Sequence, residues 1–228
     1  MNYVISDLHG CFDKYVEMIK KIKLKDSDSL FILGDIVDYG PEPFEIIKDA
    51  IMRCNVFPII GDHDYTALRM LSRLEDESAK DDASYRRNFG DWVKNKGGFT
   101  TVQAFRALSD EEKEDYLSYL GEESVLYDEI SIDGMDFVLA HAGLANFSED
   151  RPLEDYSVKE MIFEAADYEK KYFKNKSLVT GHTPTFEIDE ECRGLIYRGR
   201  GILGLDCGAV EGEHLGCICL DTDEEFYV

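Results

Sequence analysis

The chain has 228 residues, of which 44% are hydrophobic, and it carries a formal net charge of −23. The apolar fraction is sufficient for a packed core and argues against a disordered chain. The strong negative charge would repel nucleic-acid backbones and anionic membranes, so we expect neither as a partner.

The first residues lead directly into a strand, without the basic and apolar regions of a signal peptide, and no run is long enough to cross a bilayer. The six cysteines are scattered without a framework spacing, which indicates reduced thiols. We therefore expect a cytoplasmic protein, and its oligomeric state stays open.

The first third of the chain alternates strand-like and helix-like patterns. Apolar runs at 3–5, 30–33 and 56–60 predict strands, and apolar residues at helical spacing predict a helix over 12–22. Pro41 is expected in the first turn of a second helix. This β–α–β–α–β order predicts a parallel sheet with functional loops at the carboxyl ends of its strands.

The pattern becomes helical between about 65 and 123, where Ser109 and Glu112 have the spacing of a capping box. We interpret this segment as an insertion between two strands. It could be structural cover, or a cap that shapes substrate entry over the site. The two readings stay open at this point.

Strand patterns dominate the last part of the chain. Strands are predicted over 125–132 and 137–140 around an Asp133–Gly134 turn, followed by a helix over about 158–168. The short apolar runs of the tail read as antiparallel strands. With no linker or internal repeat, residues 1–228 are predicted to form a single α/β domain.

Five short segments carry metal-ligand side chains directly after apolar runs. They are Asp7-Leu8-His9-Gly10, Gly34-Asp35-Ile36-Val37-Asp38, Gly61-Asp62-His63-Asp64, His141-Ala142-Gly143 and Gly181-His182-Thr183. Carboxylates and imidazoles collected where buried strands end are what a divalent metal centre needs. The set predicts a metal-dependent hydrolase.

Spacing suggests how these side chains divide between two ions. Asp7 and His9 flank a single residue, so at a strand end both can face one ion. Asp35 can bridge two ions with its two oxygens. A second ion would be completed by Asp62, His141 and His182. Two ions roughly 3.5–4 Å apart would clamp a phosphoryl group and convert a bridging water into a nucleophile.

His63 directly follows a predicted ligand, so its expected role is different. We predict that it protonates the leaving oxygen, with a carboxylate such as Asp38 or Asp64 fixing its tautomer. If it is instead a metal ligand, its removal should release metal.

The ordered motifs resemble those of the calcineurin-like metallophosphoesterases, in particular the phosphoprotein-phosphatase branch that includes small bacterial Ser/Thr protein phosphatases. That branch is typified by D-x-H-G, G-D-x-V-D-R-G, G-N-H-[DE], H-A-G and G-H-T, and the five segments above match these motifs in order. The segment 204–210 is also similar to a late segment of the family. The Thr183-Pro184 pair after His182 replaces the G-H-x-H ending of many phosphodiesterases.

The resemblance implies a two-sheet β-sandwich flanked by helices, the αββα metallophosphoesterase fold. It also implies a dinuclear centre, with manganese as the first expectation and iron or zinc as alternatives. One ion would be held by Asp7, His9 and Asp35. The other would be held by Asp35, Asp62, His141 and His182. The resemblance makes His63 the acid and pairs it with Asp38.

The chain departs from the family pattern at three places. Tyr39 stands where the branch has an arginine, and Asp62 where it has an asparagine. A second phosphate-binding arginine is expected before the last motif, where we align Ala165. Arginine grips phosphate with a planar two-pronged hydrogen bond that tyrosine and alanine cannot copy. Tyr39 could donate its hydroxyl to a substrate oxygen or pack against Pro41.

We therefore predict an enzyme that hydrolyses phosphate monoesters through a metal-bridging hydroxide, with phosphorylated Ser or Thr in proteins as the leading substrate. A small phosphoester is the other expected partner. The alternatives are a symmetrical dinucleoside polyphosphate hydrolase, and a weakly active metal-binding regulatory protein. Replacement positive charge could come from Arg86, Arg87, Arg193, Arg198 or Arg200.

Overall fold

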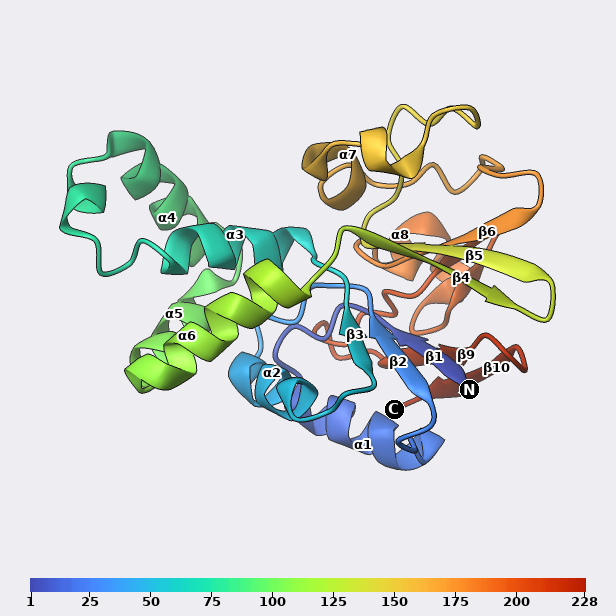
Figure 1. Ribbon diagram of the computed structural model, residues 1–228, viewed down its shortest axis with the longest axis horizontal. Coiled ribbons are helices and arrows are strands. Elements are labelled where there is room, and N and C mark those ends of the chain that lie inside the picture. Colours follow the sequence, from blue (N-terminus) through green and yellow to red (C-terminus); the bar gives the residue numbers. More distant parts are fainter.

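The computed structural model describes residues 1–228. Two five-stranded sheets pack face to face with helices on their outer sides (Figure 1). This arrangement confirms the two-sheet sandwich expected from the motifs. No helix is both long and apolar enough to span a membrane.

The first sheet contains the three parallel strands predicted from the first third of the chain. Its strands in spatial order are β10 (Glu224–Tyr227), β9 (Gly216–Cys219), β1 (Asn2–Ile5), β2 (Ser29–Ile32) and β3 (Val56–Pro58). Strands β1, β2 and β3 run parallel, whereas β9 and β10 are antiparallel to their neighbours. The connections are α1 (Phe12–Ile22) and α2 (Pro43–Ile51). The carboxyl ends of β1, β2 and β3 therefore meet at one edge.

The second sheet contains the strands that carry the last two histidine motifs. Its spatial order is β4 (Tyr127–Ile132), β5 (Met135–Ala140), β6 (Lys176–Thr180), β8 (Ile202–Gly204) and β7 (Tyr197–Arg198). Strands β5, β6 and β8 are parallel. The prediction that all tail strands are antiparallel is thus wrong for β8, which joins the parallel core of this sheet.

Alternation along the strands divides the buried side chains between two layers. Val4 of β1 belongs to the cluster between the sheets, with Leu139 of β5 and Val179 of β6. Its neighbours Tyr3 and Ile5 point to the opposite face and pack with the helices. This is the period of two expected of a strand buried on both sides. This packing fixes the two sheets against each other, so that the carboxyl ends of their parallel strands lie at the same edge of the sandwich.

The segment between β3 and β4 is helical, as predicted. It contains α3 (Asp62–Leu71), a 3₁₀ turn at Glu77–Lys80, α4 (Ala83–Asn95), α5 (Gly98–Arg106), α6 (Asp110–Ser118) and a π-type turn at Tyr119–Glu123. These helices extend away from the sandwich on one side (Figure 1). Ser109 and Glu112 form the predicted capping box at the start of α6.

Two helix boundaries differ from the prediction. Helix α2 starts at Pro43 rather than around Pro41, so Pro43 is the first-turn proline. Helix α7 covers only Val158–Ile162. Beyond it the backbone leaves the helix, because the N–H of Ala166 donates to the carbonyl of Ala142 in the loop after β5, 2.9 Å away. The remaining helix, α8, covers Thr185–Ile188.

Candidate metal centre

The five predicted segments meet where the two sheets' parallel strands end. Backbone hydrogen bonds join them: the N–H of His9 donates to the carbonyl of Asp35 at 2.8 Å, and the N–H of Gly181 donates to the carbonyl of His141 at 2.8 Å. Asp62 follows β3 and begins α3. Residues far apart in the sequence are therefore held together by sheet geometry rather than by side chains alone.

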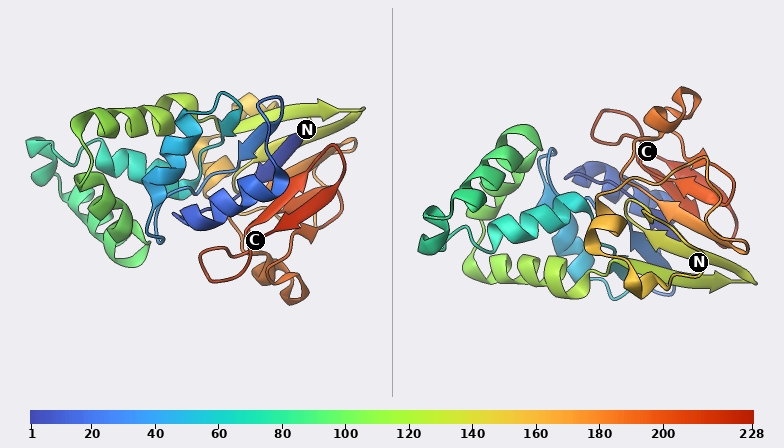
Figure 2. Two further views of the ribbon diagram at one scale, coloured as in Figure 1. Left: turned by 90° about the horizontal axis from the view of Figure 1, so that it is seen from below. Right: turned by 90° about the horizontal axis from the view of Figure 1, so that it is seen from above.

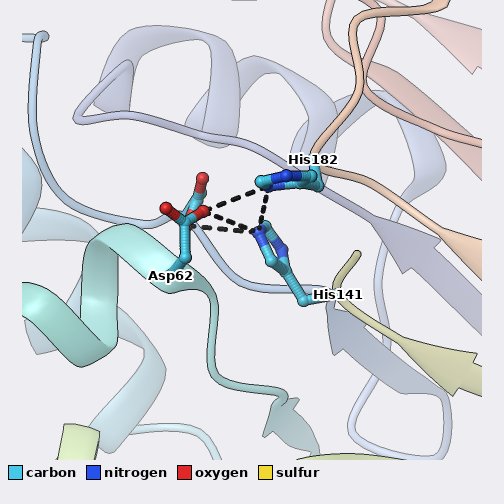
Figure 3. A group of neighbouring side chains, drawn as sticks. Asp62, His141 and His182 are labelled. Atoms are coloured by element: carbon cyan, nitrogen blue, oxygen red, sulfur yellow. Dashed lines mark hydrogen bonds and ion pairs between the residues drawn. The ribbon is translucent and has the colours of Figure 1, made fainter. Parts of the chain in front are cut away.

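Four of the predicted ligands converge tightly. One ligand atom from each of Asp35, Asp62, His141 and His182 lies within 4.8 Å of those of the others. Asp62 Oδ1 is 3.3 Å from His141 Nε2 and 3.1 Å from His182 Nδ1 (Figure 3). The two imidazole nitrogens are 3.2 Å apart. Two carboxylates and two imidazoles around one point form a mixed N/O donor set typical of a first-row divalent ion.

The outer nitrogens of two histidines are occupied by backbone carbonyls. His141 Nδ1 is 2.7 Å from the carbonyl of Leu33, and His9 Nδ1 is 2.9 Å from the carbonyl of Val37. Because a carbonyl only accepts hydrogen bonds, Nδ1 carries the proton in each ring, and Nε2 of the neutral ring presents its lone pair to the cluster. This is the outer-shell arrangement of metal-binding histidines, so the residues present fit a metal ion.

A second group contains His9, Asp35 and His63. Asp35 belongs to both groups, which is the position required of a residue shared by two ions. Asp7 lies outside both groups: its two oxygens accept the backbone N–H of His182 at 3.1 and 3.0 Å. Its carboxyl pKa is raised well above the usual value by burial and by nearby Asp206. Asp206 comes from the 204–210 segment singled out by its sequence.

His63 pairs with Asp38, as the motifs imply. His63 Nδ1 is 2.7 Å from Asp38 Oδ2. Burial alone would lower the pKa of His63, but this hydrogen bond and the charges of Asp35, Asp38 and Asp62 raise it to about 9. The raised pKa favours the protonated form that a proton donor needs. The alternative partner, Asp64, instead accepts the backbone N–H groups of Ile36, Val37 and Gly61.

Asp38 is itself held by two residues of the helical segment, which sequence reasoning did not find. Trp92 of α4 donates its indole N–H to Asp38 Oδ2 at 2.7 Å, and Thr101 of α5 donates its hydroxyl to Oδ1 at 2.6 Å. Thr101 also accepts the backbone N–H of Asp38 at 2.9 Å. All three residues are buried, so the orientation of the His63 partner depends on α4 and α5.

Backbone conformation at the site is unusual for residues with side chains. Ten non-glycine residues have positive φ, and six of them are predicted site residues: Asp7, His9, Asp35, Asp38, Tyr39 and His182. Such conformations cost free energy and gather where surrounding structure enforces a functional geometry. Their concentration among the predicted site residues indicates that the fold keeps unfavourable backbone conformations here in order to position these side chains.

Two motif glycines are required by close approach. A Cβ at Gly61 would lie 2.1 Å from Asp35 Oδ1, and a Cβ at Gly40 would lie 2.1 Å from the carbonyl oxygen of His9. Both distances are far below van der Waals contact. The glycines therefore let two ligand-bearing loops touch.

Tyr39 lies at the rim of the site. Its side chain is 45% exposed, and its ring centroid is 5.1 Å from that of His9 and 5.3 Å from that of His63. The aromatic ring therefore faces the two histidines. The aligned position of the second missing arginine, Ala165, is exposed.

None of the five arginines suggested as replacements is shown to face this centre. All are exposed, and Arg193 and Arg198 form ion pairs with nearby glutamates. An arginine that was not suggested, Arg69 of α3, lines a groove together with Trp92. Arg69 follows Asp62 by seven residues, which is about two turns of α3, so the two side chains lie on the same face of the helix. This spacing is the sequence pattern from which Arg69 could have been predicted.

The model of the calcineurin-like phosphoesterase family matches residues 3–203 of the chain. Among curated relatives, proteins named symmetrical bis(5'-nucleosyl)-tetraphosphatase match from Hamiltonella defensa, 29% identical over 82 residues, and from Buchnera aphidicola, 27% identical over 125 residues. The matches cover 35% and 52% of this chain. They span 30% and 44% of the relatives' own lengths, so less than half of each relative is represented.

Solved structures share the fold. A metallophosphoesterase from Sphaerobacter thermophilus superposes with a TM-score of 0.55 at 20% identity, covering 99% of this chain and 86% of its own. A protein serine/threonine phosphatase from Saccharomyces cerevisiae superposes with a TM-score of 0.62 at 13% identity, covering 100% and 79%. At these identities the likeness is one of architecture.

Proposed function

We propose that this chain, which belongs to the calcineurin-like phosphoesterase family, is a dinuclear metal-dependent hydrolase of phosphate monoesters. The observation that carries the proposal is the convergence of Asp35, Asp62, His141 and His182 beside the His63–Asp38 pair. A pure metal-binding protein has no need of a hydrogen-bonded His–Asp pair next to its metal. Phosphorylated Ser or Thr in proteins is the substrate class that the motifs favour.

The bound ions would supply Lewis-acid activation of water and neutralise charge on the phosphoryl oxygens. One ion would be held by Asp35, Asp62, His141 and His182, and the other by His9 and Asp35, with Asp7 orienting the backbone of the His182 loop or completing the second ion. Manganese is our first candidate. The same donor set also accepts iron and zinc.

The residues of the chain would perform the proton transfer. His63 gives its Nε2 proton to the oxygen of the departing alcohol as the bond from phosphorus to that oxygen breaks. Asp38 keeps the other ring nitrogen protonated and the ring aimed. Trp92 and Thr101 hold Asp38, so its carboxylate does not need to reorganise during the reaction. Tyr39 lies where it can contact a substrate oxygen.

The test is a substrate screen of the manganese-loaded chain with metal analysis of the same sample. Phosphopeptides, a dinucleoside tetraphosphate and a phosphodiester would be compared, with His63→Ala as the matched control. We expect metal-dependent release of phosphate from monoesters, slowed by His63→Ala at unchanged metal content. A full metal complement with no turnover of any ester would instead identify a binding or regulatory protein.

A second candidate is symmetrical hydrolysis of dinucleoside tetraphosphates. It is favoured by the names of the two curated relatives, which match 35% and 52% of this chain. The same screen separates the two candidates, because this activity releases two nucleoside diphosphates and no inorganic phosphate.

A further inference from the structure

A small groove lies beside the candidate metal centre, and two larger cavities, of about 810 and 830 Å³, are lined by other residues. The groove has a volume of about 180 Å³. Its walls come from α3, α4 and the residue after α7. They are lined by Tyr65, Thr66, Arg69, Met70, Asn88, Asp91, Trp92, Lys96 and Phe163.

Two connections place the groove next to the reacting centre. Trp92 forms part of its wall and also donates a hydrogen bond to Asp38, the partner of His63. Thr66 and Arg69 follow Asp62 by four and seven residues on α3, so all three lie on one helix face. Figure 2 shows α7 beside α3 when the molecule is seen from above. The groove therefore lies on the α3 and α4 side of the metal centre.

The middle of the groove is aromatic. Tyr65 and Phe163 meet edge to face, with ring centroids 5.9 Å apart, and Phe163 is 38% exposed although it is a large apolar side chain. An apolar cavity of about 150 Å³ is known to hold one benzene ring. The groove volume therefore suits one aromatic ring and is too small for a folded partner.

The groove wall carries two positive charges without a carboxylate partner, Arg69 and Lys96. Arg69 is exposed, forms no ion pair, and lies with its guanidinium carbon 5.6 Å from the centroid of the Tyr65 ring. The one acidic residue of the wall, Asp91, accepts a hydrogen bond from Asn95. An unpaired guanidinium is notable in a chain with a net charge of −23. At 1.5 Å per residue, Arg69 lies about 10 Å along α3 from Asp62.

We propose that this groove binds the leaving group of the substrate, and that it selects an aryl phosphate with a carboxylate or other anion on the far side of the ring. The ring packs against Tyr65 and Phe163, and its distal anion meets Arg69. This inference rests on the proposed phosphomonoesterase function and narrows its substrate class from seryl and threonyl esters to aryl esters. The reaction itself is unchanged: water adds to phosphorus, and the aryl oxygen leaves with the proton of His63.

The test compares ligands that differ only in the distal charge. The binding probes are 4-(phosphonomethyl)benzoate and its neutral carboxamide, which cannot be hydrolysed. Trp92 is the single tryptophan of the chain and lines the groove, so its fluorescence reports occupancy without turnover. The turnover probes are 4-carboxyphenyl phosphate and 4-carbamoylphenyl phosphate. Arg69→Gln is compared with Arg86→Gln, which removes an exposed arginine outside the groove.

We expect the wild-type chain to prefer the carboxylates over the carboxamides by about threefold, the size expected of an exposed ion pair. Arg69→Gln should lower the preference, with Lys96 then the one cation left on the wall, and Arg86→Gln should keep it. Equal binding of both probes by the wild-type chain, or an equal effect of the two substitutions, would overturn the proposal. Selective binding without turnover of any ester would support the groove as a binding site for an anionic aryl group and would refute the hydrolase function.

Discussion

The contact of Thr101 with Asp38 gives the sharpest prediction about the helical segment. Thr101 is fully buried, donates its hydroxyl to the Asp38 carboxylate and accepts the Asp38 backbone N–H. Thr101→Val replaces the hydroxyl with a methyl group of similar size. It therefore removes both hydrogen bonds while it leaves the packing nearly unchanged.

The expected cost follows from these two bonds. A hydrogen bond to a charged group contributes about 1.5–3 kcal/mol, and a neutral one about 1 kcal/mol. Thr101→Val should therefore lower the free energy of unfolding by about 3 kcal/mol. Thr101→Ser keeps the hydroxyl and loses one methyl group, which should cost about 1 kcal/mol.

Urea unfolding followed by circular dichroism measures the loss of unfolding free energy in both variants. Turnover then distinguishes an effect on the orientation of Asp38 and His63 from an effect on stability. If Asp38 aims His63, Thr101→Val should slow phenyl phosphate more than 4-nitrophenyl phosphate, because the poorer leaving group depends more on protonation. Thr101→Ser should slow neither selectively. Equal unfolding free energies for the two variants, or equal slowing of both esters by Thr101→Val, would refute the reasoning.

Three further predictions concern the centre and the thiols. His63→Ala should lower turnover while metal analysis shows unchanged content, and metal loss would make His63 a ligand. Tyr39→Arg combined with Asp62→Asn should raise phosphate-monoester turnover, because a two-pronged phosphate contact is added and a negative charge removed; an unchanged rate contradicts this account. Exposed Cys54 should react rapidly with a thiol reagent at pH 8, whereas buried Cys217 should not, because burial raises its pKa far above the usual range. Rapid labelling of Cys217 in the native chain would count against the described core.

The strands and the order of the site residues could be predicted from the sequence because their signals are local. An apolar run followed by a ligand residue indicates a buried strand and the residue at which it ends. Five such patterns predict that the strand ends lie together at one edge of the sheets. Spacing alone leaves the partner of His63 open between Asp38 and Asp64, and the resemblance selects Asp38, the partner found in the structure.

Contacts between distant segments could not be predicted in the same way. Trp92 and Thr101 lie 54 and 63 residues from Asp38, and their side chains alone are typical of any helix core. The predicted helix from Val158 is too long for a related reason. The backbone N–H of Ala166 donates a hydrogen bond to Ala142 in the loop after β5, which the local sequence does not indicate. The groove around Arg69 likewise exists only because three helices meet.

The sharing of Asp35 between two cations is the claim on which the mechanism depends. Anomalous diffraction from crystals grown with manganese tests it directly. We predict two manganese peaks on either side of the Asp35 carboxylate, the first contacted by His141 and His182 and the second by His9. A single peak, or no ordered cation among these side chains, would contradict the account.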